Sequence, residues 1–201
     1  MSNEFFKEWS VKFTKLLMKD FDLSALDCHA IMGNAGCESA GFKSLQEIKP
    51  LVKGSAGGFG IMQWTGPRRR LYEAYCNRNN LKPTDMMSNY KFLYVELNGD
   101  EGKAGKVLQR VKAAGTLEAK TEVFMEEFLR PGVPHLDSRI SWAKIAKAAY
   151  SSAGTPAPSE PVVEEPVVVD PVPQPTVPQS PKVNSFVTLL ISILQALFGK
   201  K

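Results

Sequence analysis

The chain has 201 residues, of which 43% are hydrophobic and 23% are charged, and its formal net charge is +4. These values are ordinary for a globular protein, and the length leaves room for one domain with an appendage or for two very small domains. Residues 1–152 hold 22 Lys and Arg against 17 Asp and Glu. So mild a basic excess suits an acidic polymer as partner but does not by itself select one.

The cysteines, Cys28, Cys37 and Cys76, form an odd set without the CxxC spacing of a metal site. Cys28 and Cys37 are expected on one helix, about half a turn out of phase, where their thiols cannot bond. We therefore expect free thiols and synthesis in a reducing compartment. The two histidines, His29 and His135, have no metal-ligand spacing with the cysteines, so the sequence predicts neither a metal nor a cofactor.

The N-terminal stretch, residues 4–20, carries apolar residues near helical spacing with lysines between them. This pattern predicts an amphipathic helix packed on the core. Because the stretch is charged throughout, it is not a signal peptide. If the protein acts outside the membrane, we therefore expect it to get there by a route other than general secretion.

A second helix is predicted to begin after Ser24, because Asp27 three residues later completes a capping box. The helix reaches Glu38. Gly33 and Gly36 within it cost about 1 kcal/mol each relative to alanine. Glycine at such positions indicates that another part of the protein packs closely against the backbone.

Residues 43–60 show no clear helical period and end in Gly57-Gly58-Phe59-Gly60, which predicts an irregular loop and a small hairpin. Pro67 suits the first turn of a following helix, with Thr65 or Gly66 as its cap. The remaining helices are predicted over 88–97, over about 102–114, from Thr116 or Thr121 to Phe128 before Pro131, and from a Ser138 cap to Tyr150. The predicted fold class is mainly α, with one small β-hairpin at the site.

Beyond this domain the composition changes, and nine of the 14 prolines lie between Pro156 and Pro181. Residues 153–182 are therefore predicted to form an extended, polyproline-like linker. At about 3 Å per residue, that linker would span roughly 80 Å.

The last segment, 183–201, contains an uncharged apolar run from Ser185 to Phe198 and ends in two lysines. The run is shorter than the ~20 residues that usually span a bilayer. Three interpretations stay open: a helix that inserts into or lies on a membrane, a self-associating helix, and a helix docked in a partner's groove. The apolar face, which no charge interrupts, and the basic end favour the membrane.

Glu38 is the leading candidate for chemistry. Its sequence neighbours are mostly apolar, and no lysine or arginine occurs from position 21 until Lys43. Cleavage of a glycosidic bond needs a carboxylic acid that donates a proton to the leaving oxygen, and an apolar, partly buried site keeps such an acid protonated. The alternative is an ordinary surface charge at a helix end.

Four segments carry a family resemblance: GNAGCESAGF (33–42), GGFGIMQWTGPRRRL (57–71), YKFLYVEL (90–97) and FMEEFLRPG (124–132). Together they resemble the phage lysozyme-like family of endolysins and phage tail lysozymes, a branch of the lysozyme superfamily. The resemblance covers about residues 20–150 and leaves the linker and the C-terminal segment unexplained.

The resemblance implies a lysozyme-like helical domain over 1–152. It implies a muramidase that cleaves the MurNAc–GlcNAc β-1,4 bond of peptidoglycan by general acid catalysis and so lyses bacteria. The expected partners are peptidoglycan and, through residues 183–201, the bacterial membrane; nucleic acid and metal are not expected. The protein would be made in the host cytoplasm and would act at the cell wall.

Carried over residue by residue, the resemblance makes Glu38 the catalytic acid and Ser39 the neighbour that organises the helix end. Gln63 would contact the sugar or an attacking water, and Trp64 would form part of the cleft wall. Arg68, first of three arginines, would meet peptide carboxylates of the substrate, or it would be a solvated residue in the first turn of a helix. The family often has an acidic residue just before its Arg-Pro pair, where this chain has Leu129.

The second catalytic group is an open question at this level. Glu47 is the only nearby carboxylate, and a solvated charge beside lysines is the alternative reading of it. Some relatives use a single acid, with the N-acetyl group of the substrate assisting or with cyclisation to an anhydro sugar. Hydrolase and lytic transglycosylase therefore both stay open, as do endolysin, virion-associated enzyme and a non-catalytic wall-binding protein anchored to a membrane.

Overall fold

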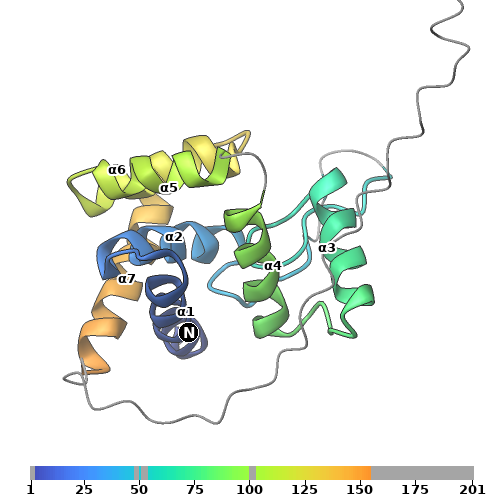
Figure 1. Cartoon of the computed structure of the whole chain (residues 1–201), viewed down its shortest axis with the longest axis horizontal. Coiled ribbons are helices and arrows are strands. Elements are labelled where there is room, and N and C mark those ends of the chain that lie inside the picture. Colours follow the sequence, from blue (N-terminus) through green and yellow to red (C-terminus); the bar gives the residue numbers. More distant parts are fainter. Residues whose placement is uncertain (1–2, 48–49, 51–53, 100–102, 155–201) are drawn as a thin grey trace, which may run out of the picture. The chain divides into compact units, whose positions relative to one another are not determined.

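The computed structural model describes residues 3–47, 50, 54–99 and 103–154, all within the compact unit Met1–Ala157. The predicted mainly helical class is confirmed (Figure 1). The helices are α1 (Glu4–Phe21), α2 (Ala25–Glu38), α3 (Gly66–Arg78), α4 (Met86–Asn98), α5 (Lys103–Ala113), α6 (Leu117–Phe124), the π-helical turn η1 (Met125–Leu129) and α7 (Leu136–Ser152). Apart from residues 153 and 154, the predicted linker and the segment 183–201 lie outside the described residues. Within the described part, no helix is long and apolar enough to cross a membrane.

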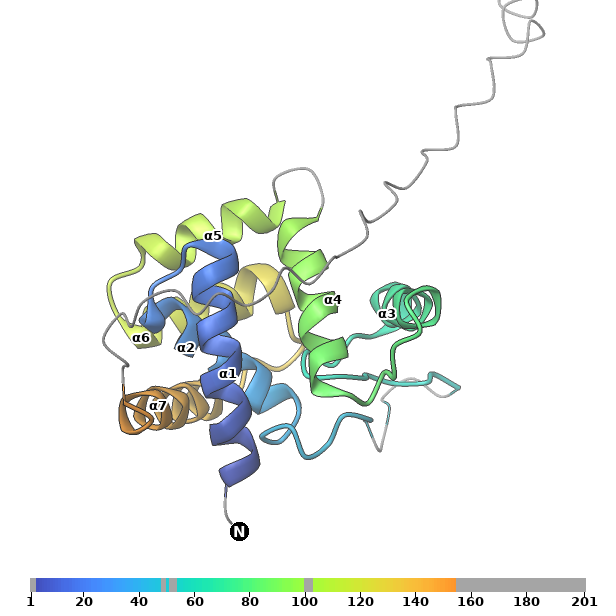
Figure 2. The same ribbon diagram turned by 60° about the horizontal axis from the view of Figure 1, so that its bottom comes forward.

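Helix α2 is the centre of the domain and packs against α1, α6 and α7 (Figures 1 and 2). Its residues 27–36 are all buried. The close packing predicted at its glycines is present: a Cβ on Gly33 would lie 2.5 Å from the Cβ of Ala143, and one on Gly36 would lie 2.8 Å from the Phe6 ring. The small residues therefore let α7 approach the backbone of α2.

The start of α2 is fixed by the predicted capping box. The Asp27 N–H donates to Oγ of Ser24 at 3.2 Å, and the Ser24 N–H donates to Oδ2 of Asp27 at 2.8 Å. Asp27 also lies 2.7 Å from Nζ of Lys120 on α6, and both side chains are buried. Burial alone would raise the pKa of Asp27, but hydrogen bonds from Lys120 and Ser24 hold it below its ordinary value. Because Lys120 also donates to the carbonyls of Val111 and Lys112, it joins the start of α2 to the end of α5.

The chain reverses directly after α2. Ala40, Gly41 and Phe42 all have positive φ angles, of 50°, 68° and 65°. This left-handed conformation is uncommon for alanine and phenylalanine. The Ser44 N–H closes the reversal with a 3.0 Å hydrogen bond to the Ser39 carbonyl.

The predicted hairpin is reduced to two isolated antiparallel bridges, Gln46–Phe59 and Phe59–Trp64, and no strand is formed among the described residues. Gly60 has a φ of 81°, and the Trp64 ring occupies the place where a side chain at position 60 would lie. The glycines therefore allow a compact turn instead of a regular ladder.

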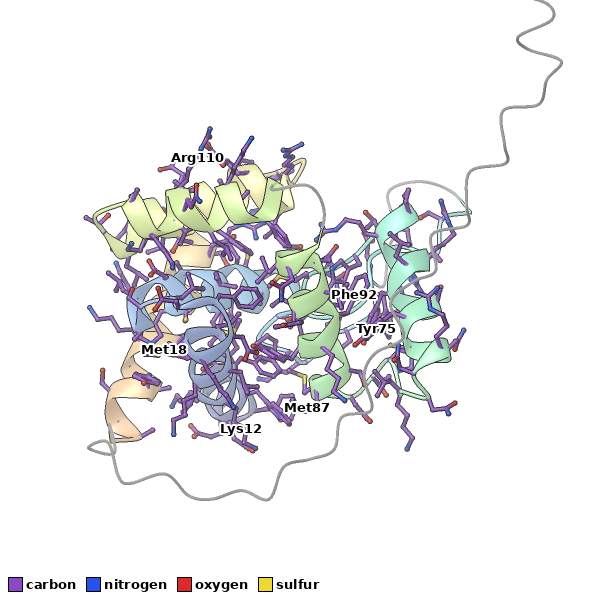
Figure 3. The ribbon with its side chains drawn as sticks, in the orientation of Figure 1. Lys12, Met18, Tyr75, Met87, Phe92 and Arg110 are labelled. Atoms are coloured by element: carbon purple, nitrogen blue, oxygen red, sulfur yellow. The ribbon has the colours of Figure 1, made fainter. Side chains whose placement is uncertain are left out.

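Helices α3 and α4 form the other side of the domain, and α4 lies between α3 and the α2 group in both ribbon views (Figures 1 and 2). The rings of Trp64, Tyr72 and Phe92 pack together with centroids 4.6 to 5.1 Å apart. Tyr75 joins them from α3 at 5.7 Å from Phe92, as the side-chain view shows (Figure 3). This aromatic cluster is the core beneath the glycine-rich turn.

Two helix boundaries differ from the prediction. Of the two predicted starts of the sixth helix, Thr116 or Thr121, the structure shows Thr116, whose side chain accepts from the Ala119 N–H. This helix, α6, ends at Phe124, and the chain continues as the π turn η1, which is closed by the Arg130 N–H on the Met125 carbonyl. The predicted Ser138 cap is wrong, because α7 already begins at Leu136 and its first turn is closed by the Arg139 N–H on the His135 carbonyl.

Candidate active site

Glu38 is the last residue of α2, and its side chain is 18% exposed. Nη2 of Arg139, on α7, lies 2.8 Å from Oε1 of Glu38. No described residue donates to the second oxygen, Oε2. Among the described residues, one oxygen of the carboxylate is therefore held by a cation and the other has no donor.

Arg139 is itself fixed on every side. Its side chain is 3% exposed, Nε donates to the Pro134 carbonyl at 2.7 Å, and Nη1 donates to Oδ1 of Asn34 at 3.2 Å. Asn34 in turn donates to the Thr121 carbonyl of α6 at 3.0 Å. A guanidinium with three separate partners cannot swing away, so Glu38 is held in a pre-arranged position.

Arg139 is the residue that the sequence argument missed. The sequence neighbours of Glu38 predicted apolar surroundings, but the structure adds a cation from α7, far along the chain. One signal was present: Arg139 shares a helix face with Ala143 and Ala146, both buried. A charged residue on an apolar face requires a buried partner.

Ser39 directly follows α2 as its C-cap residue and is fully buried. Its hydroxyl donates to the Ala35 carbonyl at 2.7 Å and accepts from the Phe42 N–H at 3.1 Å. Both hydrogen bonds lie within the turn after α2. Ser39 therefore stabilises the backbone next to Glu38, and it does not lie on a surface that a substrate could reach.

Gln63 connects the glycine-rich turn to the segment after α2. Its Nε2 lies 3.0 Å from the Gly60 carbonyl, 3.2 Å from that of Leu45 and 3.4 Å from that of Ser44. Ser44 is hydrogen-bonded to Ser39, the neighbour of Glu38. Gln63 is therefore linked to the end of α2 through two hydrogen bonds, which leaves its Oε1 for other donors.

Trp64 and Arg68 both bind Glu96 of α4. Nε1 of Trp64 donates to Oε2 of Glu96 at 2.6 Å, while Arg68 makes a bidentate pair with the same carboxylate at 2.7 and 2.8 Å. Trp64 is fully buried, so the predicted cleft wall is not formed by its side chain in this structure. Arg68 is 33% exposed and also lies over the Phe128 ring, at 5.1 Å from its centroid.

Glu47 is placed by the glycine-rich turn. Its Oε2 accepts from the Gly58 N–H at 2.7 Å, and its own N–H donates to the Gly58 carbonyl at 2.8 Å. The side chain is partly exposed. It is therefore an oriented carboxylate, in contrast to the freely solvated charge that the alternative reading described.

The cysteines are all free thiols, as predicted, and burial raises the pKa of both Cys28 and Cys76. Cys37 is partly exposed and contacts Oγ of Ser138 at 3.5 Å. Within the described ranges no group of His, Cys, Asp and Glu is arranged to hold a metal ion.

These features define a class: a mainly helical domain whose central helix ends in one arginine-paired glutamate, with a glycine-rich turn that Gln63 joins to the segment after that helix. The family model of the phage tail lysozymes matches residues 8–150, and the chain belongs to that family. No curated protein matches the chain. Family membership gives the protein a lysozyme-like function in general terms, the enzymatic degradation of peptidoglycan.

Proposed function

We propose that the protein is a muramidase that cleaves the MurNAc–GlcNAc β-1,4 bond of peptidoglycan, with Glu38 as the general acid. The observation that carries the proposal is the Glu38 carboxylate at the end of α2, with one oxygen fixed by Arg139 and the other without a described donor. Membership of a lysozyme family supports the substrate class.

In the proposed mechanism, the Glu38 carboxylate held by Arg139 first takes up a proton from solvent on Oε2 and then gives it to the oxygen of the leaving sugar. The carboxylate becomes negative as the bond breaks, and Arg139 stabilises the charge that appears. Because Arg139 is already held by Pro134 and Asn34, this stabilisation requires no rearrangement at the moment of reaction.

The matched test compares Glu38→Gln with Glu122→Gln, the same chemical change at an exposed position of α6. Loss of a general acid typically lowers the rate by about 10²- to 10⁴-fold. We expect that loss on cell-wall suspensions for Glu38→Gln alone, with the folded fraction of both variants checked by circular dichroism. Equal clearing by Glu38→Gln and wild type would contradict the proposal.

The product chemistry separates the two possible outcomes of this acid step. A hydrolase leaves reducing sugar ends, and a lytic transglycosylase leaves anhydro ends. Mass spectrometry of digested muropeptides distinguishes them, and we expect reducing ends because Glu47 supplies an oriented second carboxylate.

For residues 183–201 we propose association with the bacterial membrane, after synthesis in the host cytoplasm, so that the domain works at the cell wall. The support is the uncharged apolar run that ends in lysines. Deleting 183–201 should leave activity on isolated peptidoglycan intact and remove binding to liposomes of anionic lipid. Full-length protein that does not bind liposomes, or truncated protein that is inactive on isolated peptidoglycan, would count against this role.

A further inference from the structure

Arg69 makes a set of contacts different from those of the arginines beside it. Its side chain is 15% exposed, and Nη1 donates to the carbonyls of Ala56 and Gly57, the latter at 3.1 Å. The guanidinium also lies over the Phe59 ring, 5.1 Å from its centroid. Its Nε donates to Oε1 of Glu73, one turn along α3, at 2.8 Å. Arg69 therefore connects a rigid helix to the glycine-rich turn.

The turn that Arg69 holds is the one that orients Glu47. Gly58, next to Gly57, donates its N–H to Oε2 of Glu47 and pairs with the Glu47 backbone. Gly57 has a φ of 74°, and a Cβ there would lie 3.0 Å from the same Glu47 oxygen. The carboxylate therefore rests directly on the two glycines, and its Oε1 has no donor among the described residues.

Glycines supply no side chains of their own to fix a turn, and their backbones are conformationally permissive. Other residues must therefore hold the turn in place. Arg69 does so with two hydrogen bonds to carbonyls and one contact with a ring, all within residues 56–59. A planar guanidinium is suited to this because it presents several donors in a rigid fork, whereas a lysine presents a single ammonium.

We infer that Arg69 is a positioning residue that holds the Gly57–Gly58 turn so that Glu47 is presented to the glycan as the second carboxylate of the reaction. The inference rests on the proposed function, because it assumes that the bond cleaved is glycosidic. It assigns different tasks to neighbouring arginines: Arg68 binds Glu96, and Arg69 orients a carboxylate of the site.

The test is a double-mutant cycle of Arg69→Met and Glu47→Gln, with kcat and KM measured on purified peptidoglycan. Since small misplacements of reacting groups are costly, we expect each single variant to lower kcat by about tenfold or more. The double variant should be no slower than Glu47→Gln alone, because Arg69 acts through Glu47. Arg69→Lys should recover only part of the loss.

Arg78→Met is the matched control, since Arg78 is an exposed arginine on the same helix. It should leave kcat unchanged. Thermal unfolding of every variant identifies assay temperatures at which all are folded. If Arg69→Met does not fold, Arg69→Lys, which keeps the charge and the apolar stem but loses the planar fork, replaces it in the cycle.

Three results would overturn the inference: an Arg69→Met protein as fast as Arg78→Met, losses that multiply in the double variant, or a Glu47→Gln protein with wild-type kcat. None of these depends on the Glu38 test. If Glu38→Gln is inactive while Arg69→Met is fully active, the inference fails and the proposed function stands; if Glu38→Gln is fully active, the proposed function itself fails.

Discussion

Arg139 holds Oε1 of Glu38 at 2.8 Å from a position that is almost completely buried, so the exposed end of α2 is tied to the interior of the domain. The same guanidinium binds the loop before α7 and the Asn34 side chain of α2. A change in the packing of α2 on α7 would therefore move the carboxylate of Glu38, the candidate acid.

Replacing Arg139 tests this relationship. Arg139→Met leaves Glu38 and Asn34 without their partner, and removal of one member of a buried ion pair typically costs about 3–5 kcal/mol. We expect a lower free energy of unfolding in urea by that order. Activity at a temperature where the variant is folded should fall by at least about tenfold, because Glu38 loses its fixed orientation.

A cycle with Glu38→Gln separates the two effects of Arg139. If Arg139 acts on the reaction through Glu38, then Arg139→Met should not slow the Glu38→Gln protein further. A variant that loses stability but retains the wild-type kcat would show that the arginine has only a structural task.

The free energy of unfolding should depend on pH through the titration of His29. This residue of α2 is buried against Tyr150, and neither ring nitrogen has a hydrogen-bond partner within the described structure. Burial, together with the nearby charge of Lys147, lowers the pKa of His29 to about 4 from an ordinary value of 6.5. The unfolded chain therefore binds more protons than the folded one between these values, so stability falls as pH drops from 6.5 towards 4.

The size of this effect follows from the shift, at about 1.4 kcal/mol per pH unit, and amounts to roughly 3 kcal/mol over the whole window. Asp27 contributes below that window, because its pKa is held under 3.8 and its stabilisation is lost only at lower pH. Urea unfolding of wild type and His29→Leu between pH 7 and pH 4 checks the assignment. We expect a flatter profile for His29→Leu; parallel profiles would refute it.

The contact between Gly33 and α7 gives a packing prediction. A methyl group on Gly33 would lie 2.5 Å from the Ala143 Cβ and 2.6 Å from the Arg139 carbonyl, and backbone atoms cannot move aside easily. We expect Gly33→Ala to lower the free energy of unfolding by about 1–3 kcal/mol. Activity should fall as well, because α7 carries Arg139.

Gly105→Ala on α5 is the control for the helix preference of alanine, since nothing lies within 4 Å of a Cβ at that position. This variant should be neutral or more stable by up to about 1 kcal/mol. Equal behaviour of the two variants in thermal unfolding would mean that α2 and α7 are not in close contact.

Local signals predicted much of the fold. The Ser24–Asp27 capping box and Pro67 in the first turn of α3 depend on residues a few positions apart, so the sequence displays them directly. The π turn was missed because it depends on a bond of Arg130 to Met125 in place of the usual helical partner. The small hairpin was over-predicted because its glycines allow tight turns that interrupt a ladder.

The candidate site was predicted less completely, because its contacts join distant segments. Glu38 and Gln63 are recognisable from sequence, but the Arg139 pair, the Glu96 carboxylate shared by Trp64 and Arg68, and the Arg69 contacts with the glycine-rich turn are formed only on folding. Trp64 shows the limit most clearly: its position in a motif suggested a surface role, and packing on Tyr72 and Phe92 buries it.

Because of the left-handed reversal at Ala40, Gly41 and Phe42, the position of Glu38 does not depend on the length of the segment that follows. The Ser44–Ser39 hydrogen bond closes the turn before that segment begins. Insertions after Ser44 can therefore lengthen the neighbouring loop while the carboxylate stays where α2 and α7 place it.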